Sequence, residues 1–141
     1  MILLTKIFRF EASHAIHEYP GLCKNIHGHS YKLLVSVTNI HPSEMDKKFG
    51  FVMDFKALKT LVNIHILDYF DHQLIVSKKY LKEHQNLNGL ENIIVWDLEP
   101  SAENMILFIQ KKLETVLPSN IKLVKLKLFE TADSFIELNY D

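Results

Sequence analysis

Alternation of apolar and polar residues marks both ends of the chain as β-structure. Residues 2–13 form an apolar run with loose alternation and several aromatics, and residues 29–40 alternate more strictly. Residues 121–130 and 134–140 repeat this period of two near the C-terminus. Side chains in a strand point alternately to two faces, so each segment is predicted to bury one face of a sheet.

Between these strands, two segments have apolar residues at helical spacing. The first covers about 55–70, and Asp54 before it is a suitable N-cap. The second follows Pro100 and runs to about 117. The intervening residues 73–98 have no clear period, apart from a short apolar run that predicts a strand at 93–96.

The order of elements is therefore strand-strand-helix-helix-strand-strand, which is an α+β pattern. We expect a four-stranded antiparallel sheet with two helices on one face, in a single domain over residues 1–141. Such a sheet has two open edges, and no segment of the chain is predicted to cover them. Edge pairing between subunits is the simplest solution, so we expect a homo-oligomer.

Composition narrows the class of protein. The chain has 141 residues, of which 48% are hydrophobic, so it can bury a substantial core. No apolar run approaches the roughly 20 residues that cross a bilayer. The net charge is -1, with 16 basic and 17 acidic residues, which predicts neither nucleic acid nor membrane as a partner. A single cysteine excludes an internal disulfide and fits a cytoplasmic protein.

The candidate chemistry starts with histidines near the N-terminus. In the run Cys-Lys-Asn-Ile-His-Gly-His, an extended backbone would point His27 and His29 to the same side. His14 ends the preceding apolar run and supplies a third nitrogen if the two strands pair. Three imidazoles suit a tetrahedral zinc ion with an open fourth position, which is the catalytic pattern. Imidazole also binds copper, iron and nickel, although zinc is the commonest choice.

The only cysteine, Cys23, begins the same run and has three interpretations. It completes a closed structural site with the three histidines, or it is an unligated catalytic thiol, or it is a small buried hydrophobic residue. Lys24 beside it and a nearby metal would favour the thiolate, so we prefer the catalytic interpretation.

Carboxylates and a further histidine form the second group of candidates. Asp71 and His72 end the first predicted helix, where a histidine caps the helix dipole or acts as a general acid or base. Adjacent residues usually face apart, so another carboxylate is an alternative partner for His72. Glu130 continues the apolar parity of Val124 to Leu128 and is predicted to point inward. A buried carboxylate needs a partner, either a cation of the protein or the N–H groups of a ligand ring.

Together these residues resemble the 6-pyruvoyltetrahydropterin synthase / 6-carboxytetrahydropterin synthase family. The matching motifs occur in order from residue 10 to residue 131, and the ordered set is far more specific than any one motif. They are Phe10-x-Ala12-x-His14, Cys23-x3-His27-Gly28-His29, Gly50-x-Val52-x-Asp54-Phe55, Asp71-His72, Pro100-Ser101-x-Glu103-Asn104 and Glu130-Thr131. The resemblance implies the tunnelling fold (T-fold), which has the same order of elements and forms barrels by edge pairing, commonly as hexamers of two trimers.

The resemblance also implies roles for individual residues. The three histidines would bind Zn²⁺, and Cys23 would be the catalytic thiol. Asp71 and His72 would complete the catalytic group across a subunit interface. Glu130 would accept hydrogen bonds from the pterin ring, with Thr131 beside it.

The start of the second helix would also contact the substrate. Ser101 stands where the family usually has threonine after proline, which should preserve the backbone contacts of that position. The segment 73–97 is longer than in compact bacterial members, which leaves the loop geometry around His72 open.

The implied substrate is 7,8-dihydroneopterin triphosphate. Elimination of triphosphate with internal redox gives 6-pyruvoyltetrahydropterin, whereas additional carbon–carbon cleavage gives 6-carboxy-5,6,7,8-tetrahydropterin and acetaldehyde for queuosine synthesis. The three-residue spacer between Cys23 and His27 resembles the carboxy-forming bacterial members. We therefore expect the carboxy-forming lyase. The alternative from another class is a non-catalytic zinc protein whose closed site only stabilises the fold.

Overall fold

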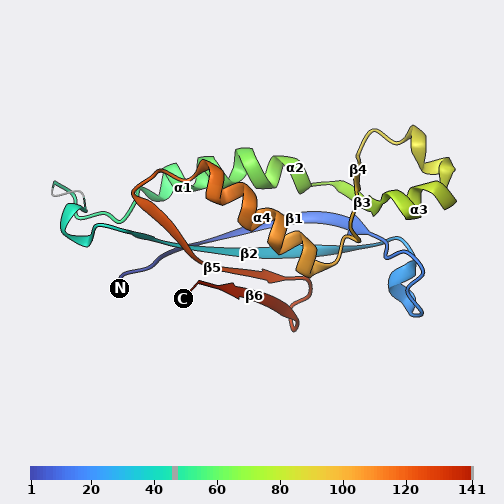
Figure 1. Ribbon diagram of the computed structural model, residues 1–141, viewed down its shortest axis with the longest axis horizontal. Coiled ribbons are helices and arrows are strands. Elements are labelled where there is room, and N and C mark those ends of the chain that lie inside the picture. Colours follow the sequence, from blue (N-terminus) through green and yellow to red (C-terminus); the bar gives the residue numbers. More distant parts are fainter. Residues whose placement is uncertain (46–47, 141) are drawn as a thin grey trace.

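The computed structural model of the protein describes residues 1–45 and 48–140. It is elongated, with helices covering one face of a single sheet (Figure 1). The strand order is β4-β3-β1-β2-β5-β6. The strands are β1 Leu4–His14, β2 His27–Asn39, β3 Gln73–Ser77, β4 Ile93–Trp96, β5 Ile121–Phe129 and β6 Phe135–Asn139. The α-helices are α1 Phe55–Val62, α2 Asp68–Phe70, α3 Lys78–Glu83 and α4 Ala102–Val116.

The expected α+β architecture is confirmed, but the expected number of strands is wrong. Strands β1, β2, β5 and β6 form the predicted antiparallel ladder. Strand β3 adds in parallel to the end of β1, and β4 adds in parallel to β3, so the sheet has six strands. Four of the five residues of β3 are buried in succession. A strand buried on both faces reads as a short continuous apolar run, which carries no alternation to recognise.

The helix-covered face of the sheet holds the main core. Leu33, Val35 and Val37 of β2 are fully buried, as their alternation predicts. In β5 the prediction of Val124 on the inward face is wrong. The register shifts at Ser36/Val37, and the buried residues are Leu123 before the bulge and Leu126 and Leu128 after it. A bulge inserts one unpaired residue, so the parity of the strand changes there.

Both predicted helices are present, and the first begins at the expected cap, Asp54. The side chain of Asp54 accepts a hydrogen bond from the N–H of Lys56, and α1 continues through a π-helical turn, η3 Asn63–Leu67, into α2. The side chain of Ser101 accepts from the N–H of Asn104 at the start of α4. Each cap satisfies an N–H group that has no partner within the helix.

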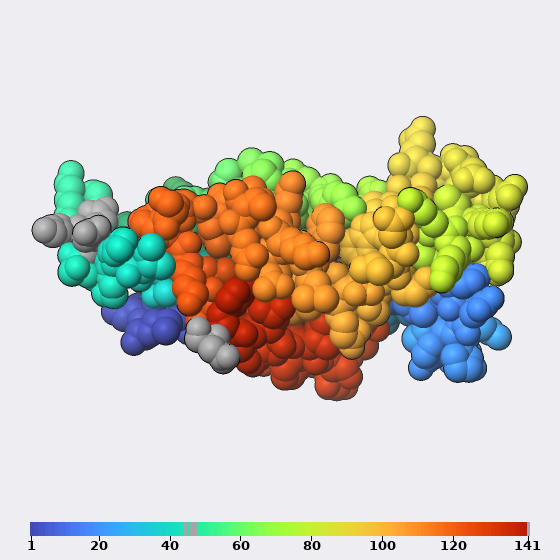
Figure 2. All heavy atoms as spheres, in the orientation of Figure 1, coloured from blue at the N-terminus to red at the C-terminus, as the bar shows by residue number. Residues whose placement is uncertain are grey.

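The segment 73–98 builds a smaller second core beside the first. It contains β3, α3, the 3₁₀ turn η4 Gln85–Gly89 and β4. Leu74, Val76, Tyr80 and Leu87 of this segment form the second core with Ala15, which is fully buried at the beginning of the loop after β1. This loop and the α3 segment lie together at one end of the molecule (Figure 2). Over the described residues, none of the helices has the length and apolar character needed to cross a membrane.

Truncation of a core residue on α4 should show which face of that helix is buried. Ile109 is fully buried, so Ile109→Ala is expected to lower the free energy of unfolding by about 2–5 kcal/mol. The matched change Leu107→Ala, at a residue that is 44% exposed, should cost about 0.5 kcal/mol or less. Urea denaturation followed by circular dichroism measures both values, and equal costs would contradict the assigned face.

Candidate active site

A cluster of three histidines forms where the β1–β2 ladder ends. The register places His14 opposite His27 and Ala12 opposite His29, and alternation turns the three rings to the same face. The ring centroids are 4.6 to 5.3 Å apart. One ligand nitrogen from each ring lies within 4.8 Å of the other two. The structure therefore brings together the three histidines that the sequence singled out.

Hydrogen bonds to carbonyl groups orient two of these rings. Nδ1 of His14 lies 2.6 Å from the Pro100 carbonyl oxygen, and Nδ1 of His27 lies 2.7 Å from that of Asn25. Carbonyl oxygens only accept, so both Nδ1 atoms carry the hydrogen and both Nε2 atoms of the neutral rings present lone pairs. These Nε2 atoms are 3.0 Å apart. Two facing lone pairs at this distance require a proton or a metal cation between them.

The third ring contributes a nitrogen that has no hydrogen bond. Nε2 of His29 is buried and lacks a hydrogen-bond partner among the described residues. It lies 3.1 Å from Oε1 of Glu130, at an orientation unsuited to a hydrogen bond. Buried polar atoms are rarely left without a partner, so such an atom needs an explanation. A cation bound by the three imidazoles would supply it, and the donor set therefore fits a metal ion.

Burial also favours the protonation state that a metal requires. Desolvation lowers the pKa of His14, against the opposing effects of the Pro100 carbonyl and the Glu130 charge. Desolvation likewise lowers the pKa of His29. Histidine binds metal as the neutral imidazole, so a lowered pKa keeps the lone pairs available at neutral pH.

The lowered pKa values predict that acid destabilises the metal-free protein. The unfolded chain takes up protons near pH 6.5, the ordinary histidine value, whereas folded His14 and His29 take them up only at lower pH. Stability is therefore complete above about pH 6.5 and falls as pH falls through the lowered pKa values. Urea denaturation of chelator-treated protein between about pH 8 and pH 5 measures the slope. His29→Gln should flatten it and His41→Gln, at an exposed residue, should not; equal slopes would contradict the assignment.

Cys23 lies in the loop between the two histidine-bearing strands. It belongs to the 3₁₀ turn η1 Leu22–Lys24 and is partly buried, and its thiol is free. The N–H of Ile16 donates a hydrogen bond of 2.8 Å to the Cys23 carbonyl oxygen, which closes the loop. The group of possible ligand atoms around His14 does not include Cys23 in the part of the chain that the structure describes. This placement favours an unligated thiol over a fourth ligand.

Asp71 and His72 contact each other, although adjacent residues usually face apart. Oδ2 of Asp71 lies 3.0 Å from Nδ1 of His72. The backbone of His72 has φ 63°, a left-handed conformation that costs a residue other than glycine about 1–3 kcal/mol. Hydrogen bonds hold it there: the His72 N–H donates to the Glu11 carbonyl at 2.6 Å, and Asn92 Nδ2 donates to the His72 carbonyl at 3.0 Å. This backbone turn allows Asp71 itself to orient the ring.

Among the described residues of one chain, no hydrogen bond or ion pair joins this pair to the three imidazoles. His72 lines a cavity of about 420 Å³ together with Glu11, Ser13, Ser30 and one member of the cluster, His29. Neighbouring residues of a strand point to opposite faces, so the Glu11, Ser13 and Ser30 side chains lie on the face away from His14 and its partners. The His72 side chain is 78% exposed. His29 is the one residue of the cluster that lines this cavity.

The predicted substrate-binding residues occupy three different settings. Glu130 follows β5, and Oε1 of its partly buried carboxylate lies 3.1 Å from Nε2 of His29. Thr131 is exposed in the β5–β6 turn, where its hydroxyl accepts a hydrogen bond of 3.3 Å from the Asp133 N–H. Ser101 uses its hydroxyl to cap α4. Their contacts with a substrate stay predictions.

Two residues near the site were missed by sequence reasoning about chemistry. The hydroxyl of Tyr31 is buried with no hydrogen-bond partner among the described residues, and burial raises its pKa. Tyr31 lies two residues after His29 and therefore on the same face of β2, which was the available indication. Alternation alone, however, assigns a tyrosine on that face to the hydrophobic core. Glu99 accepts a hydrogen bond of 2.7 Å from the N–H of His17. No local pattern indicates this contact, because the two residues are distant in sequence.

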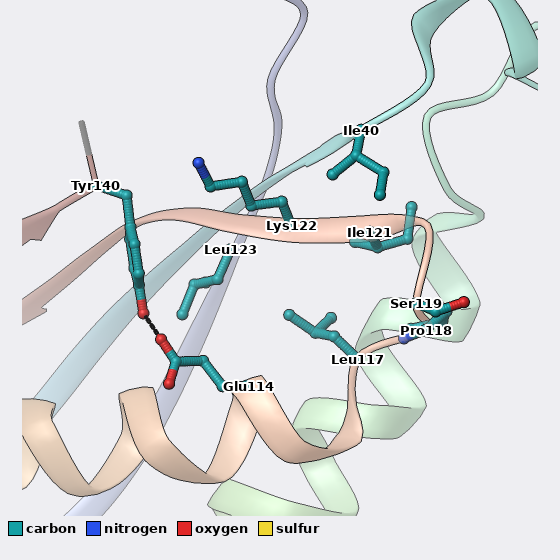
Figure 3. A pocket seen from close by; sticks show the side chains of 9 residues that line it. All are labelled: Ile40, Glu114, Leu117, Pro118, Ser119, Ile121, Lys122, Leu123 and Tyr140. Carbon is teal, nitrogen blue, oxygen red and sulfur yellow. Dashed lines mark hydrogen bonds between the residues drawn. The ribbon is translucent and has the colours of Figure 1, made fainter.

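A second cavity, of about 330 Å³, lies between the end of α4 and the start of β5 (Figure 3). On its wall the hydroxyl of Tyr140 donates to the Glu114 carboxylate, and Gln110 Nε2 donates to that hydroxyl at 2.8 Å. Burial and the Glu114 bond raise the pKa of Tyr140 to about 12, so the phenol stays protonated. The cavity adjoins Ile40, which directly follows the last residue of β2, whereas His27 is the first residue of that strand. The length of β2 separates it from the histidine cluster by about 40 Å.

Comparison with known proteins places this site in a family. The family profile described as 6-pyruvoyl tetrahydropterin synthase matches residues 3–141. The chain is 30% identical over 143 residues to 6-carboxy-5,6,7,8-tetrahydropterin synthase of Rickettsia conorii, covering 98% of this chain and 100% of that protein. An uncharacterized protein of Wolinella succinogenes has a similar structure, with a TM-score of 0.79, 18% identity, and coverage of 99% and 98%. The 6-pyruvoyl tetrahydropterin synthase of Caenorhabditis elegans is also similar in structure, with a TM-score of 0.71 and 22% sequence identity, and the match covers 99% of this chain and 96% of that chain. The structural likeness shows a shared fold, and the profile match over nearly the whole length shows that the chain belongs to the 6-pyruvoyl tetrahydropterin synthase family.

Proposed function

We propose that the protein is a zinc-dependent 6-carboxy-5,6,7,8-tetrahydropterin synthase. It would convert 7,8-dihydroneopterin triphosphate and water to 6-carboxytetrahydropterin, acetaldehyde and triphosphate, as a step toward queuosine. The observation that carries this proposal is the convergence of three imidazoles, two of which are oriented by backbone carbonyl groups. The names of relatives such as the Rickettsia conorii protein support the choice of reaction.

The donor set suits zinc, and His14, His27 and His29 would hold it. Bound there, zinc would supply Lewis acidity that lowers the pKa of the substrate's side-chain hydroxyls. The Pro100 and Asn25 carbonyls keep two of the ligands in the correct tautomer and ring orientation. Loss of such outer contacts typically weakens metal binding about 10- to 100-fold.

Three further residues would handle the substrate. The Cys23 thiolate would remove a proton from the side chain, and His72 would exchange a second proton. Asp71 lies 3.0 Å from Nδ1 of His72 and would orient its ring. Glu130 would accept hydrogen bonds from the pterin ring, with Ser101 and Thr131 nearby, and would fix the reacting carbons near the thiol.

This assignment requires more than one subunit. Among the described residues, no hydrogen bond or ion pair joins the Asp71–His72 pair to the three imidazoles, so a neighbouring subunit would bring a second such pair to the cluster. We propose a cytoplasmic homo-oligomer of single-domain T-fold subunits, a hexamer of two trimers, in which neighbouring chains complete each site. The outer strands β4 and β6 provide edges for such pairing.

Product identification tests the proposal directly. Zinc-loaded protein is incubated with 7,8-dihydroneopterin triphosphate, and the products are identified by mass spectrometry, with chelator-treated protein as the control. Acetaldehyde together with 6-carboxytetrahydropterin is the expected result. Formation of 6-pyruvoyltetrahydropterin would assign the alternative synthase reaction instead. No turnover would reject both reactions and favour a structural zinc protein.

A further inference from the structure

The dipeptide Glu99–Pro100 contacts two parts of the site at once. The Pro100 carbonyl oxygen orients His14 through Nδ1 at 2.6 Å. One residue earlier, Oε1 of Glu99 accepts a hydrogen bond of 2.7 Å from the backbone N–H of His17. His17 belongs to the loop between β1 and β2, the loop that also carries Cys23. The dipeptide therefore joins the histidine cluster to the thiol loop.

The path from His17 to the thiol is short. Ile16, the neighbour of His17, donates its N–H to the Cys23 carbonyl oxygen at 2.8 Å. On the other side, Ala15 is fully buried in the second core. A contact that fixes the backbone of His17 therefore also fixes its neighbour Ile16, to which the Cys23 carbonyl oxygen is hydrogen-bonded.

Glu99 is itself held firmly against the core. Its carbonyl oxygen accepts hydrogen bonds from the Ser101 N–H and from Asn104 Nδ2, both at 2.9 Å. These bonds attach it to the start of α4, where Met105 is fully buried. A hydrogen bond to a carboxylate is also stronger than one between neutral groups. Glu99 therefore anchors the loop to a rigid element.

The other contact of His17 is weaker as an anchor. Its ring lies between two carboxylates, with Nε2 3.4 Å from Glu18 and Nδ1 3.7 Å from Glu83. The Glu18 and Glu83 side chains are 76% and 57% exposed. Exposed ion pairs contribute little because water screens them and mobile side chains must be ordered.

We propose that Glu99 is a positioning residue, which holds the Cys23 thiol in register with the histidine cluster by binding the backbone of His17. The inference rests on the proposed catalytic role of Cys23. The relevant group of Glu99 is its acceptor oxygen, since the bond is made to an N–H. Glutamine retains an acceptor oxygen at the same place, whereas alanine removes it.

The experiment compares Glu99→Ala, Glu99→Gln and the control Glu91→Gln, a change at an exposed residue of the 73–98 segment. Three quantities are measured: kcat and KM, bound zinc per chain, and the rate at which iodoacetamide alkylates Cys23 in zinc-free protein. For Glu99→Ala we expect kcat to fall about 10- to 100-fold, because small misplacements of a reacting group have large effects. We expect KM within about twofold and alkylation about threefold faster or more, since the loop opens locally. Glu99→Gln should recover most of both changes.

Two outcomes would overturn the proposal. Unchanged alkylation and unchanged kcat in Glu99→Ala would show that the contact does not position the thiol. Loss of zinc in Glu99→Ala to the same extent as activity would assign Glu99 to support of the metal cluster through Pro100. Alkylation needs no turnover, so it still tests the positioning role if wild-type protein forms no pterin product. That failure would count against the proposed function alone.

Discussion

Cys23→Ala is expected to abolish nearly all product formation while one zinc ion per chain stays bound. The thiol would act as a proton-transfer group, and such groups contribute about 10²- to 10⁴-fold to rate. Cys23 lies outside the group of ligand atoms formed by His14, His27 and His29, so its removal leaves all three ligands in place. Product formation is measured by mass spectrometry and bound zinc by a chromophoric chelator.

Cys23→Ser is the matched control for this result. Serine preserves size and polarity but ionises far less readily than a thiol, so Cys23→Ser should be about as inactive as Cys23→Ala. The thermal midpoints of both variants should stay close to that of the wild type. If instead zinc is lost in both variants along with activity, the thiol is a metal ligand, and the site is a closed structural one.

His29→Ala is expected to remove both zinc binding and turnover. Loss of an inner ligand should weaken zinc binding by more than the roughly 10- to 100-fold that follows changes in outer contacts. Nε2 of His29 is buried without a hydrogen bond, so removing the ring leaves no unpaired partner except Glu130. The folded protein should therefore persist, with two imidazoles that hold zinc poorly.

Zinc affinity is measured by competition with a chromophoric chelator, alongside turnover. The control is His41→Ala, since His41 is exposed and outside the cluster. It should bind zinc and turn over as wild type does. Retention of wild-type zinc affinity by His29→Ala would remove this residue from the metal site and would leave the orphaned nitrogen unexplained.

Much of the site could be predicted from local pattern because its central part is built on one strand pair. His27 and His29 are two residues apart, and a strand turns such residues to one face whatever surrounds it. His14 required only that consecutive strands pair, which they commonly do. The cap Asp54 was equally predictable, since a helix start needs an acceptor for its free N–H groups.

Other features depended on contacts between distant residues. Strand β3 is a short apolar run, and only its parallel pairing with the end of β1 identifies it as part of the sheet. The bulge opposite Ser36/Val37 shifts the parity of β5, which no count along that strand reveals. The contact between Asp71 and His72 follows from a left-handed backbone that Glu11 and Asn92 hold in place.

The amino-acid sequence by itself determined the α+β class, the buried faces of β1 and β2 and the convergence of three imidazoles, because each follows from the period of a strand or helix. Only the tertiary structure decided the six-stranded sheet, the orientation of His14 by Pro100 and the attachment of the Cys23 loop through Glu99. It also placed His72 in a cavity that His29 lines. These depend on pairings between residues far apart in the chain, which local periodicity does not encode.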